Sequence, residues 1–186
     1  MLIVGAFPLH EGQTTLLADV LSSDGLVLRP LAPATDASAL HAVFGERSQL
    51  TYMLRGPTRD VAETRALLLR WAEDRKSPQW AITRDGGEAV GRFTLVHKRD
   101  GVLEVGLQVV PASQRQGLAT RAIVLATQHA FDQKAAVRVF ADIDPDNVGC
   151  VRAFERAGYE HEGLLRANWV VGDDTFDSVI MAKLAW

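Results

Sequence analysis

The sequence predicts one mixed α/β domain, in which a central and mostly antiparallel sheet carries helices on both faces. Early strand patterns are joined by short turn signals, which are typical of antiparallel hairpins. Later strand patterns alternate with helical ones, which indicates strand-helix-strand units. Hydrophobic residues make up 47% of the 186 residues, enough for one sizeable core. The predicted order of elements is β-α-α-β-β-β-α-β-α-β-β.

The domain is expected to span residues 26–186, after an N-terminal extension of residues 1–25 that ends in the turn-like Ser22-Ser23-Asp24-Gly25. Residues 2–9 are apolar and could pack on their own domain or cross to a second subunit, so a homodimer is one expected assembly. The N-terminus has no basic region, so no secretory signal is predicted. No run approaches the roughly 20 apolar residues that span a bilayer. We therefore expect a cytoplasmic protein without a membrane partner.

The charge balance and the cysteine count exclude several classes of function. The formal net charge is -3 and the sequence pI is about 5.9. A nucleic-acid-binding surface needs the opposite sign, whereas mild acidity suits a cationic partner such as an amine. The single cysteine, Cys150, cannot form an intramolecular disulfide or a cysteine-based metal site, and it fits a reducing compartment. The five histidines are scattered, so no metal site is expected.

The first predicted elements are a strand and two helices. Residues 26–31 are mostly apolar and end in a proline-rich turn, as expected of a strand. Apolar residues at helical spacing follow Asp36 as far as Phe44 and predict the first helix. The second helix is expected to begin at Thr58 and to reach Trp71.

Strands and helices then alternate to the C-terminus. The strand 102–110 ends before Pro111, which lacks the N–H that a ladder needs. The other predicted strands are 80–83, 89–96, 137–143, 164–171 and 176–184, with turns at Asp85-Gly86-Gly87, Asp100-Gly101 and Gly172-Asp173-Asp174. The predicted helices are 117–131 and 147–157, the second closed by Gly158.

The most distinctive local feature joins the strand 102–110 to the helix 117–131. It reads Val109-Val110-Pro111-Ala112-Ser113-Gln114-Arg115-Gln116-Gly117-Leu118-Ala119-Thr120. A helix start has unpaired N–H donors and binds anions readily, and Gly117 lets a phosphate approach the backbone without a Cβ in the way. The segment is therefore a candidate diphosphate cradle. The alternative is an ordinary strand-to-helix turn, and the segment matches neither a P-loop nor the dinucleotide fingerprint.

A second feature begins at Asp144 and continues to Tyr159. Asp146 or Asn147 can cap its helix, and Gly158 can end it in the left-handed conformation. Taken alone, this stretch is a well-capped amphipathic helix.

Together the two segments resemble motifs A and B of the GNAT superfamily of N-acetyltransferases. Gln114, Gly117 and Ala119 match the acetyl-CoA signature Gln/Arg-x-x-Gly-x-Gly/Ala, and Asn147 matches the asparagine of motif B. The resemblance extends over residues 26–186 and is greatest for the branch that contains the ribosomal-protein N-terminal acetyltransferases. That branch also holds enzymes acting on other amines.

The resemblance implies a GNAT-like fold, in which the fourth and fifth strands splay apart and the pantetheine arm of acetyl-CoA lies in the gap. Acetyl-CoA would be the cosubstrate, and a primary amine (a protein N-terminus or a small amine) would be the acceptor, held near residues 33–60 and the terminal hairpin. No metal is implied. The residues implied in cofactor binding are Leu107, Val109, Val110, Gln114, Arg115, Gln116, Gly117, Leu118, Ala119, Thr120 and Asn147.

The implied reaction is direct attack of the amine on the thioester in a ternary complex. At pH 7 roughly one-tenth of an α-amino group is neutral, against about one lysine in 2,500, so a general base matters more for lysine. Glu104 is the preferred base, because its strand resembles the base-bearing strand of the family, and Asp142 on the neighbouring strand is the second candidate. Phe154 stands where many family members have a proton-donating tyrosine. Cys150 could donate instead, though weakly, or be a small buried hydrophobe.

Phe154 and Cys150 leave a second hypothesis open. The chain could bind an acyl-CoA without catalysis, as a sensor or an interaction module. A third reading is a nucleotide-binding or interaction domain in which the motif is coincidental.

Overall fold

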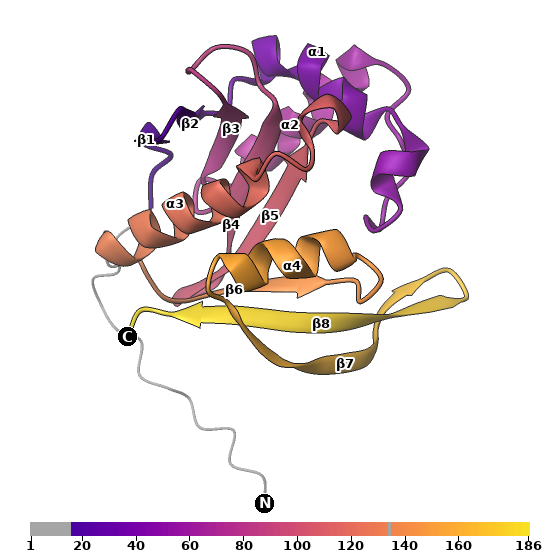
Figure 1. The fold of residues 1–186 in the computed structure, drawn as a ribbon. Helices are drawn as coiled ribbons and strands as arrows, with labels where there is room; N and C mark the ends of the chain where they lie inside the picture. Colours follow the sequence, from indigo (N-terminus) through magenta and orange to yellow (C-terminus); the bar gives the residue numbers. More distant parts are fainter. Residues whose placement is uncertain (1–15, 134) are drawn as a thin grey trace, which may run out of the picture.

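The computed structural model describes residues 16–133 and 135–186, and residues 2–9 with the dimer expectation that rests on them lie outside this range. The strands form one eight-stranded sheet of order β1-β2-β3-β4-β5-β6-β8-β7, in which only the β5–β6 pair is parallel (Figure 1). Within the described residues, no helix combines the length and the apolar character needed to cross a bilayer.

The strands and helices follow the predicted order apart from one strand that was not predicted, β1, and their bounds differ from the predicted ones by a few residues. The strands are β1 (Leu21–Ser23), β2 (Leu26–Pro30), β3 (Gln79–Thr83), β4 (Gly91–Arg99), β5 (Gly101–Val109), β6 (Ala136–Ile143), β7 (Glu160–Val171) and β8 (Asp174–Leu184). The helices are α1 (Pro33–Phe44), α2 (Val61–Ala72), α3 (Leu118–Asp132) and α4 (Val148–Arg156), with short 3-10 turns η1 (Arg47–Leu50) and η2 (Pro111–Ser113). The mixed sheet with helices on both faces is confirmed.

The first strand, β1, lies before residue 26 and pairs antiparallel with β2. Asp24 and Gly25 make the turn between them, with φ of 47° and 74°. Two consecutive positive φ angles are those of a type I′ hairpin turn, which matches the twist of the flanking strands. Residues 21–23 thus extend the sheet at its edge, and the domain boundary at residue 25 stays a prediction.

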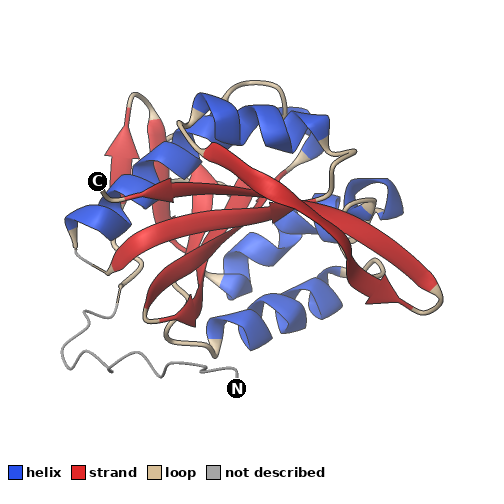
Figure 2. Cartoon of the chain, turned by 90° about the horizontal axis from the view of Figure 1, so that it is seen from below, coloured by secondary structure: helices blue, strands red, loops and turns tan. Residues whose placement is uncertain are grey.

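The sheet separates two apolar layers, which Figure 2 shows as helices on its two faces. Trp80 and Ile82 point from β3 into the larger cluster, which includes the apolar faces of α3 and α4. Ala81, between them, points to the opposite face and packs with α1 and α2. This alternation follows from the two-residue period of a strand. It puts α3 and α4 on one face of the sheet and residues 33–72, here called the α1–α2 segment, on the other.

The sheet opens between β5 and β6. These two strands pair only where Gly101–Glu104 meets Ala136–Phe140. Beyond that point β5 stays paired with β4 as far as Val109, whereas β6 stays paired with β8 as far as Ile143. The edges of β5 and β6 that face one another are therefore unpaired over their last residues. The predicted splay is confirmed.

Two helix starts differ from the predicted ones because of local capping. The first helix begins at Pro33, and Asp36 lies in its first turn, where its carboxylate accepts the Ala32 N–H at 2.8 Å. The second begins at Val61, because the Asp60 carboxylate accepts the Glu63 N–H at 2.8 Å. The Thr58 hydroxyl is buried and lies 2.6 Å from the Thr64 hydroxyl, so it is used in packing and not as a cap.

Candidate active site

A cavity of about 810 Å³ lies where β5 and β6 separate. Its walls come from the α1–α2 segment, from both unpaired strand edges, from the N-terminal part of α3 and from α4 along its length. A volume of this size is in the range of small-molecule and cofactor sites. The opening of the sheet therefore produces a binding site, because no neighbouring strand covers the exposed edges.

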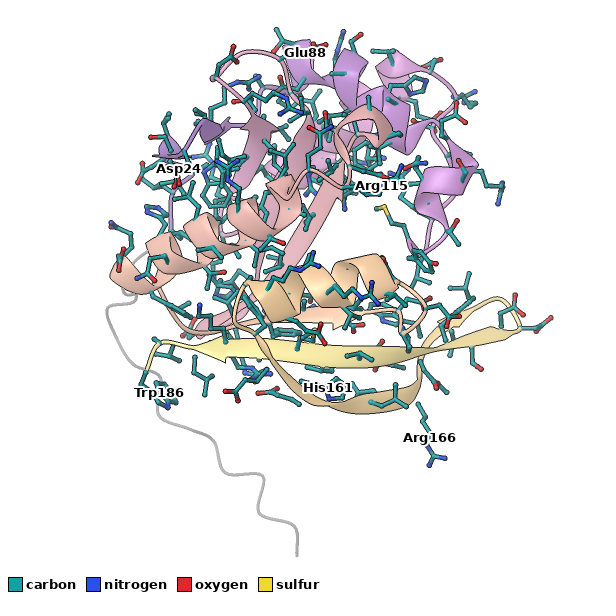
Figure 3. The ribbon with its side chains drawn as sticks, in the orientation of Figure 1. Asp24, Glu88, Arg115, His161, Arg166 and Trp186 are labelled. Atoms are coloured by element: carbon teal, nitrogen blue, oxygen red, sulfur yellow. The ribbon has the colours of Figure 1, made fainter. Side chains whose placement is uncertain are left out.

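The loop before α3 presents unbonded backbone donors to this cavity. Among the described residues, no hydrogen bond uses the backbone N–H of any residue from Arg115 to Thr120. Gly117, at the N-cap, has φ of 75° and no side chain caps the helix. Arg115, labelled in Figure 3, also has a positive φ, of 59°. Left-handed residues turn successive N–H groups into a concave anion site, so the geometry suits a diphosphate.

Three arginine side chains add positive charge to the cavity: Arg115 in the loop, and Arg152 and Arg156 on α4. The two on α4 are one helical turn apart, so they share a face. Sequence reasoning missed both of them. The available signal was their i, i+4 spacing in the motif B helix, but only the packing of α4 beside α3 shows that this face lines the cavity.

Most of the predicted site residues line the cavity. They are Leu107, Val109, Gln114, Arg115, Gly117, Leu118, Ala119, Thr120, Asp142, Asn147 and Cys150. Asn147 is also the N-cap of α4, since its Oδ1 accepts the Cys150 N–H at 3.2 Å. Its Nδ2 makes no hydrogen bond within the described part of the chain, which leaves both of its N–H donors free for a ligand.

Three predicted residues, Glu104, Val110 and Gln116, are not part of the lining. The Val110 N–H donates to Val90 O at 2.9 Å, and its side chain packs in the α1–α2 layer. The Gln116 side chain donates to Ala112 O at 3.1 Å and accepts from Arg84. Gln116 can therefore contribute its backbone N–H but not its side chain.

Glu104 lies in the part of β5 that is still paired with β6. It is in register with Phe140, and its Oε2 is 2.8 Å from the Lys98 Nζ. The structure thus does not bring Glu104 to the cavity. Its role as general base stays a prediction.

Asp142 lies two residues beyond Phe140 and lines the cavity. Its carboxylate accepts from Asn168 Nδ2 at 2.9 Å and lies 3.2 Å from Trp169 Nε1. Both donors are neutral. They orient the carboxylate and leave its charge uncompensated by any ion pair among the described residues. Asp142 is therefore placed to meet a cationic amine.

The α1–α2 segment crosses from one side of the cavity to the other. Gln49 Oε1 accepts from Gln114 Nε2 at 2.9 Å, which links the segment to the loop before α3. The Tyr52 hydroxyl donates to Asp146 O at 3.2 Å, which links it to the start of α4. Sequence reasoning placed the acceptor near residues 33–60, but nothing in the sequence singled out these two side chains.

Cys150 and Phe154, on α4, both line the cavity. Phe154 is buried and packs edge-to-face on Tyr159, with ring centroids 4.9 Å apart. Burial raises the pKa of the Cys150 thiol to about 11. An ordinary thiol has a pKa of about 8.5, so proton transfer from Cys150 to a departing thiolate would be uphill. The geometry thus favours an apolar wall over an acid.

We expect Cys150 to react slowly with alkylating reagents. Because its pKa is raised, the thiol stays protonated through neutral pH. At pH 8 roughly 0.1% is thiolate, against about 24% for an ordinary cysteine. Iodoacetamide should therefore modify the folded protein about 200-fold more slowly than the protein unfolded in guanidinium, as followed by mass spectrometry. Equal rates in the two states would show that the thiol is neither buried nor perturbed.

The comparison with protein families decides the assignment. The family model described as "Acetyltransferase (GNAT) domain" matches residues 25–160, well over half of the chain. The chain belongs to the GNAT acetyltransferase family. This GNAT protein is accordingly an N-acetyltransferase, and the family resemblance of its two motifs is confirmed.

Curated relatives and solved structures agree with this assignment. The uncharacterized N-acetyltransferase YoaA of Bacillus subtilis is 24% identical over 79% of this chain and 86% of its own length. The spermidine N(1)-acetyltransferase of Escherichia coli K12 is 23% identical over 86% of each chain.

Among solved structures, a probable GNAT acetyltransferase from Chromobacterium violaceum superposes with a TM-score of 0.82 at 24% identity, covering 100% of this chain and 97% of its own. Two further structures share the fold at lower identity. The Vibrio cholerae spermidine N-acetyltransferase, solved with CoA and spermine, gives a TM-score of 0.74 at 20% identity, covering 87% and 96% of the two chains. The Salmonella typhimurium enzyme that modifies the N-terminal serine of ribosomal protein L7/L12 gives 0.78 at 15% identity, covering 89% and 99%.

Proposed function

We propose that this GNAT enzyme binds acetyl-CoA in the opening between β5 and β6 and transfers the acetyl group to a primary amine by direct attack in a ternary complex. The observation that carries the proposal is the run of unbonded amides from Arg115 to Thr120, a loop whose residues other than Gln116 line the cavity beside the unpaired β5 edge. Relatives and structural neighbours are acetyltransferases for spermidine and for a ribosomal protein N-terminus, which supports an amine acceptor.

In this proposal the chain's own residues hold the two substrates. The amides of the Arg115–Thr120 loop, with Arg152 and Arg156, hold the phosphates. The unpaired edge of β5 and the free Nδ2 of Asn147 hold the pantetheine arm. The site then supplies preorganised donors and proximity, the two effects that contribute most to acyl transfer without a covalent intermediate.

The amine nitrogen forms a bond to the thioester carbonyl carbon, the carbon–sulfur bond breaks, and the thiolate leaves. The amine must lose a proton before or during attack. Asp142 is the general base that accepts this proton in our scheme, directly or through a water, because Asp142 lies at the cavity and Glu104 does not. The proton that the thiolate finally takes comes from solvent in this scheme, since Phe154 has no acidic hydrogen and the Cys150 thiol is a weaker acid than the leaving group.

Calorimetry and a turnover assay together test the proposal. Acetyl-CoA should bind with micromolar or tighter affinity, and CoA release, detected with a thiol reagent, should require an amine. Absence of both heat and thermal stabilisation with acetyl-CoA would contradict the proposed donor. A second candidate function, an acyl-CoA-binding module without catalysis, is favoured by the lack of an acid at Phe154 and Cys150; it predicts tight binding with no CoA release over a broad panel of amines.

A further inference from the structure

A buried arginine lies behind the wall of the cavity without an anionic partner. Arg92, on β4, is 5% exposed. Its Nη1 donates to Gln108 Oε1 at 3.0 Å and its Nη2 to Gln79 Oε1 at 2.5 Å, so both partners are neutral amides. Its Nε is buried and has no hydrogen-bond partner. Within the described residues, no carboxylate lies within ion-pair distance of the guanidinium, which is unusual for a buried charge.

A second cation shares the same aromatic ring. The Arg92 guanidinium lies 4.2 Å from the Trp71 ring centroid, and that of Arg55 lies 5.8 Å from it. Arg55 Nη1 is also buried without a hydrogen-bond partner. Burial lowers the pKa of both groups, that of Arg92 to about 9, which still leaves it charged at neutral pH. Two cations thus lie within 6 Å of the centroid of one indole ring. The charge of Arg70 lowers the pKa of Arg55 further, and the charge of Glu63 opposes this shift.

The guanidinium of Arg92 is close to the acceptor side of the cavity. Arg92 is in register with Gln108 on β5, and Gln108 and Gly106 both line the cavity. Gly106 has no side chain, and a Cβ built on it would lie 3.9 Å from Arg92 Nη1. Arg92 itself is not part of the lining, and Gly106, Gln108 and the Thr94 methyl group, 2.7 Å from the same added Cβ, lie next to it on the cavity side. This face of β5 is the one covered by α1 and α2, away from the phosphate-binding arginines.

We propose that the acceptor of this enzyme carries a carboxylate as well as its amine, and that Arg92 binds this carboxylate when the Gln108 side chain turns aside. The inference rests on the proposed function and names its substrate class. Arg92 Nη1 is held on the cavity side by the Gln108 amide alone, so it can donate a charge-assisted hydrogen bond to a carboxylate oxygen that takes the place of that amide. Asp142, on β6, and Asp144, just after that strand, also line the cavity and would face the ammonium group of the acceptor. An acceptor with an ammonium group and a carboxylate would have each charge near a protein charge of the opposite sign, whereas a polyamine would place positive charge near Arg92.

The test compares matched acceptors on the wild-type enzyme. Glycine, leucine and phenylalanine are each paired with the corresponding carboxamide, and spermidine is the polyamine. CoA release is measured for each, and kcat/KM is corrected for the neutral fraction of each amine. We expect the acid of each pair to exceed its amide by about 100-fold, the order expected for hydrogen bonds to a charged group. Equal rates within the pairs, or a preference for spermidine, would overturn the proposal.

The variants Arg92→Met and Arg99→Met test whether Arg92 causes the preference for acids over amides. Arg92→Met removes the buried charge at similar volume, so it should abolish the preference for acids through KM while amide turnover continues. Removing an unpaired buried cation should leave the unfolding temperature unchanged or higher. Arg99 is exposed on the same strand, and Arg99→Met should keep the preference. A merely structural role of Arg92 would instead lower the rates for acids and amides alike.

Failure of the carboxylate inference can be distinguished from failure of the proposed function. Failure to bind acetyl-CoA would refute the proposed donor, and the acceptor comparison is made only with an enzyme that releases CoA. If Arg92→Met does not fold, the wild-type acid-to-amide ratios still decide, because they depend on no variant. A ratio near one with full acetyl-CoA turnover refutes the carboxylate inference alone.

Discussion

Replacing Gly117 with valine is expected to weaken acetyl-CoA binding by about 100-fold or more, as measured by calorimetry. Gly117 has φ of 75°, and a Cβ placed on it finds no protein atom within 4 Å. The valine side chain would therefore project into the space from which phosphates approach the amides. The left-handed conformation also costs a residue with a Cβ roughly 1–2 kcal/mol, so the loop would tend to rearrange and lose its concave donor arrangement.

The matched control is Gly25→Val. Gly25 has φ of 74°, also has no atom within 4 Å of an added Cβ, and lies in the β1–β2 turn, outside the cavity lining. Both variants carry the same backbone strain, so both should lose similar stability on thermal unfolding. Only Gly117→Val should lose affinity. Undiminished acetyl-CoA binding by Gly117→Val would show that the amides from Arg115 to Thr120 do not hold the phosphates.

Asp142→Asn is expected to lower kcat/KM by about 100-fold, the lower end of what a general base contributes, while the affinity for acetyl-CoA stays unchanged. Asparagine keeps the shape of the side chain and removes its charge. The two neutral donors, Asn168 and Trp169, hold Asp142 in place without neutralising it, so charge is what this position offers the amine. Initial rates at saturating acetyl-CoA with varied amine measure the effect.

Glu104→Gln is the competing variant, because Glu104 and Asp142 are alternative bases. Our assignment gives the larger loss to Asp142→Asn, since Glu104 is engaged with Lys98 where the strands are still paired. A large loss of kcat/KM in Glu104→Gln but not in Asp142→Asn would show that Glu104 is the general base. Asp132→Asn, at the exposed end of α3, removes one negative charge far from the cavity and should leave the rate unchanged.

Local signals predicted elements well wherever one residue type dictated the backbone. Pro111 ends β5 because it has no N–H to pair, and Gly158 ends α4 at φ of 79°. The start of the second helix was predicted at Thr58 and lies at Val61. Asp60 is the cap, and the Thr58 hydroxyl is buried against Thr64.

The residues of the site also fall into predictable and unpredictable groups. The loop with unbonded amides before α3 was predictable because it is contiguous: a strand stop, a glycine and a helix start lie within a few residues of one another. The partners of Gln114 and Asp146 were not predictable, since Gln49 and Tyr52 are 65 and 94 residues away from them. Arg92 carried no signal at all, because an arginine in a strand is ordinarily exposed.

By itself the sequence determined the order of strands and helices, the amide-rich start of α3 and the capped helix that follows β6, since each depends on residues close together in the chain. The tertiary structure decided what lies across the opening: that Asp142 and not Glu104 reaches the cavity, that Arg152 and Arg156 face it, and that Arg92 is buried behind its wall. The physical reason is that register and packing set these distances. A shift of one or two residues along β5 or β6 changes which side chain lies at the point where the strands separate.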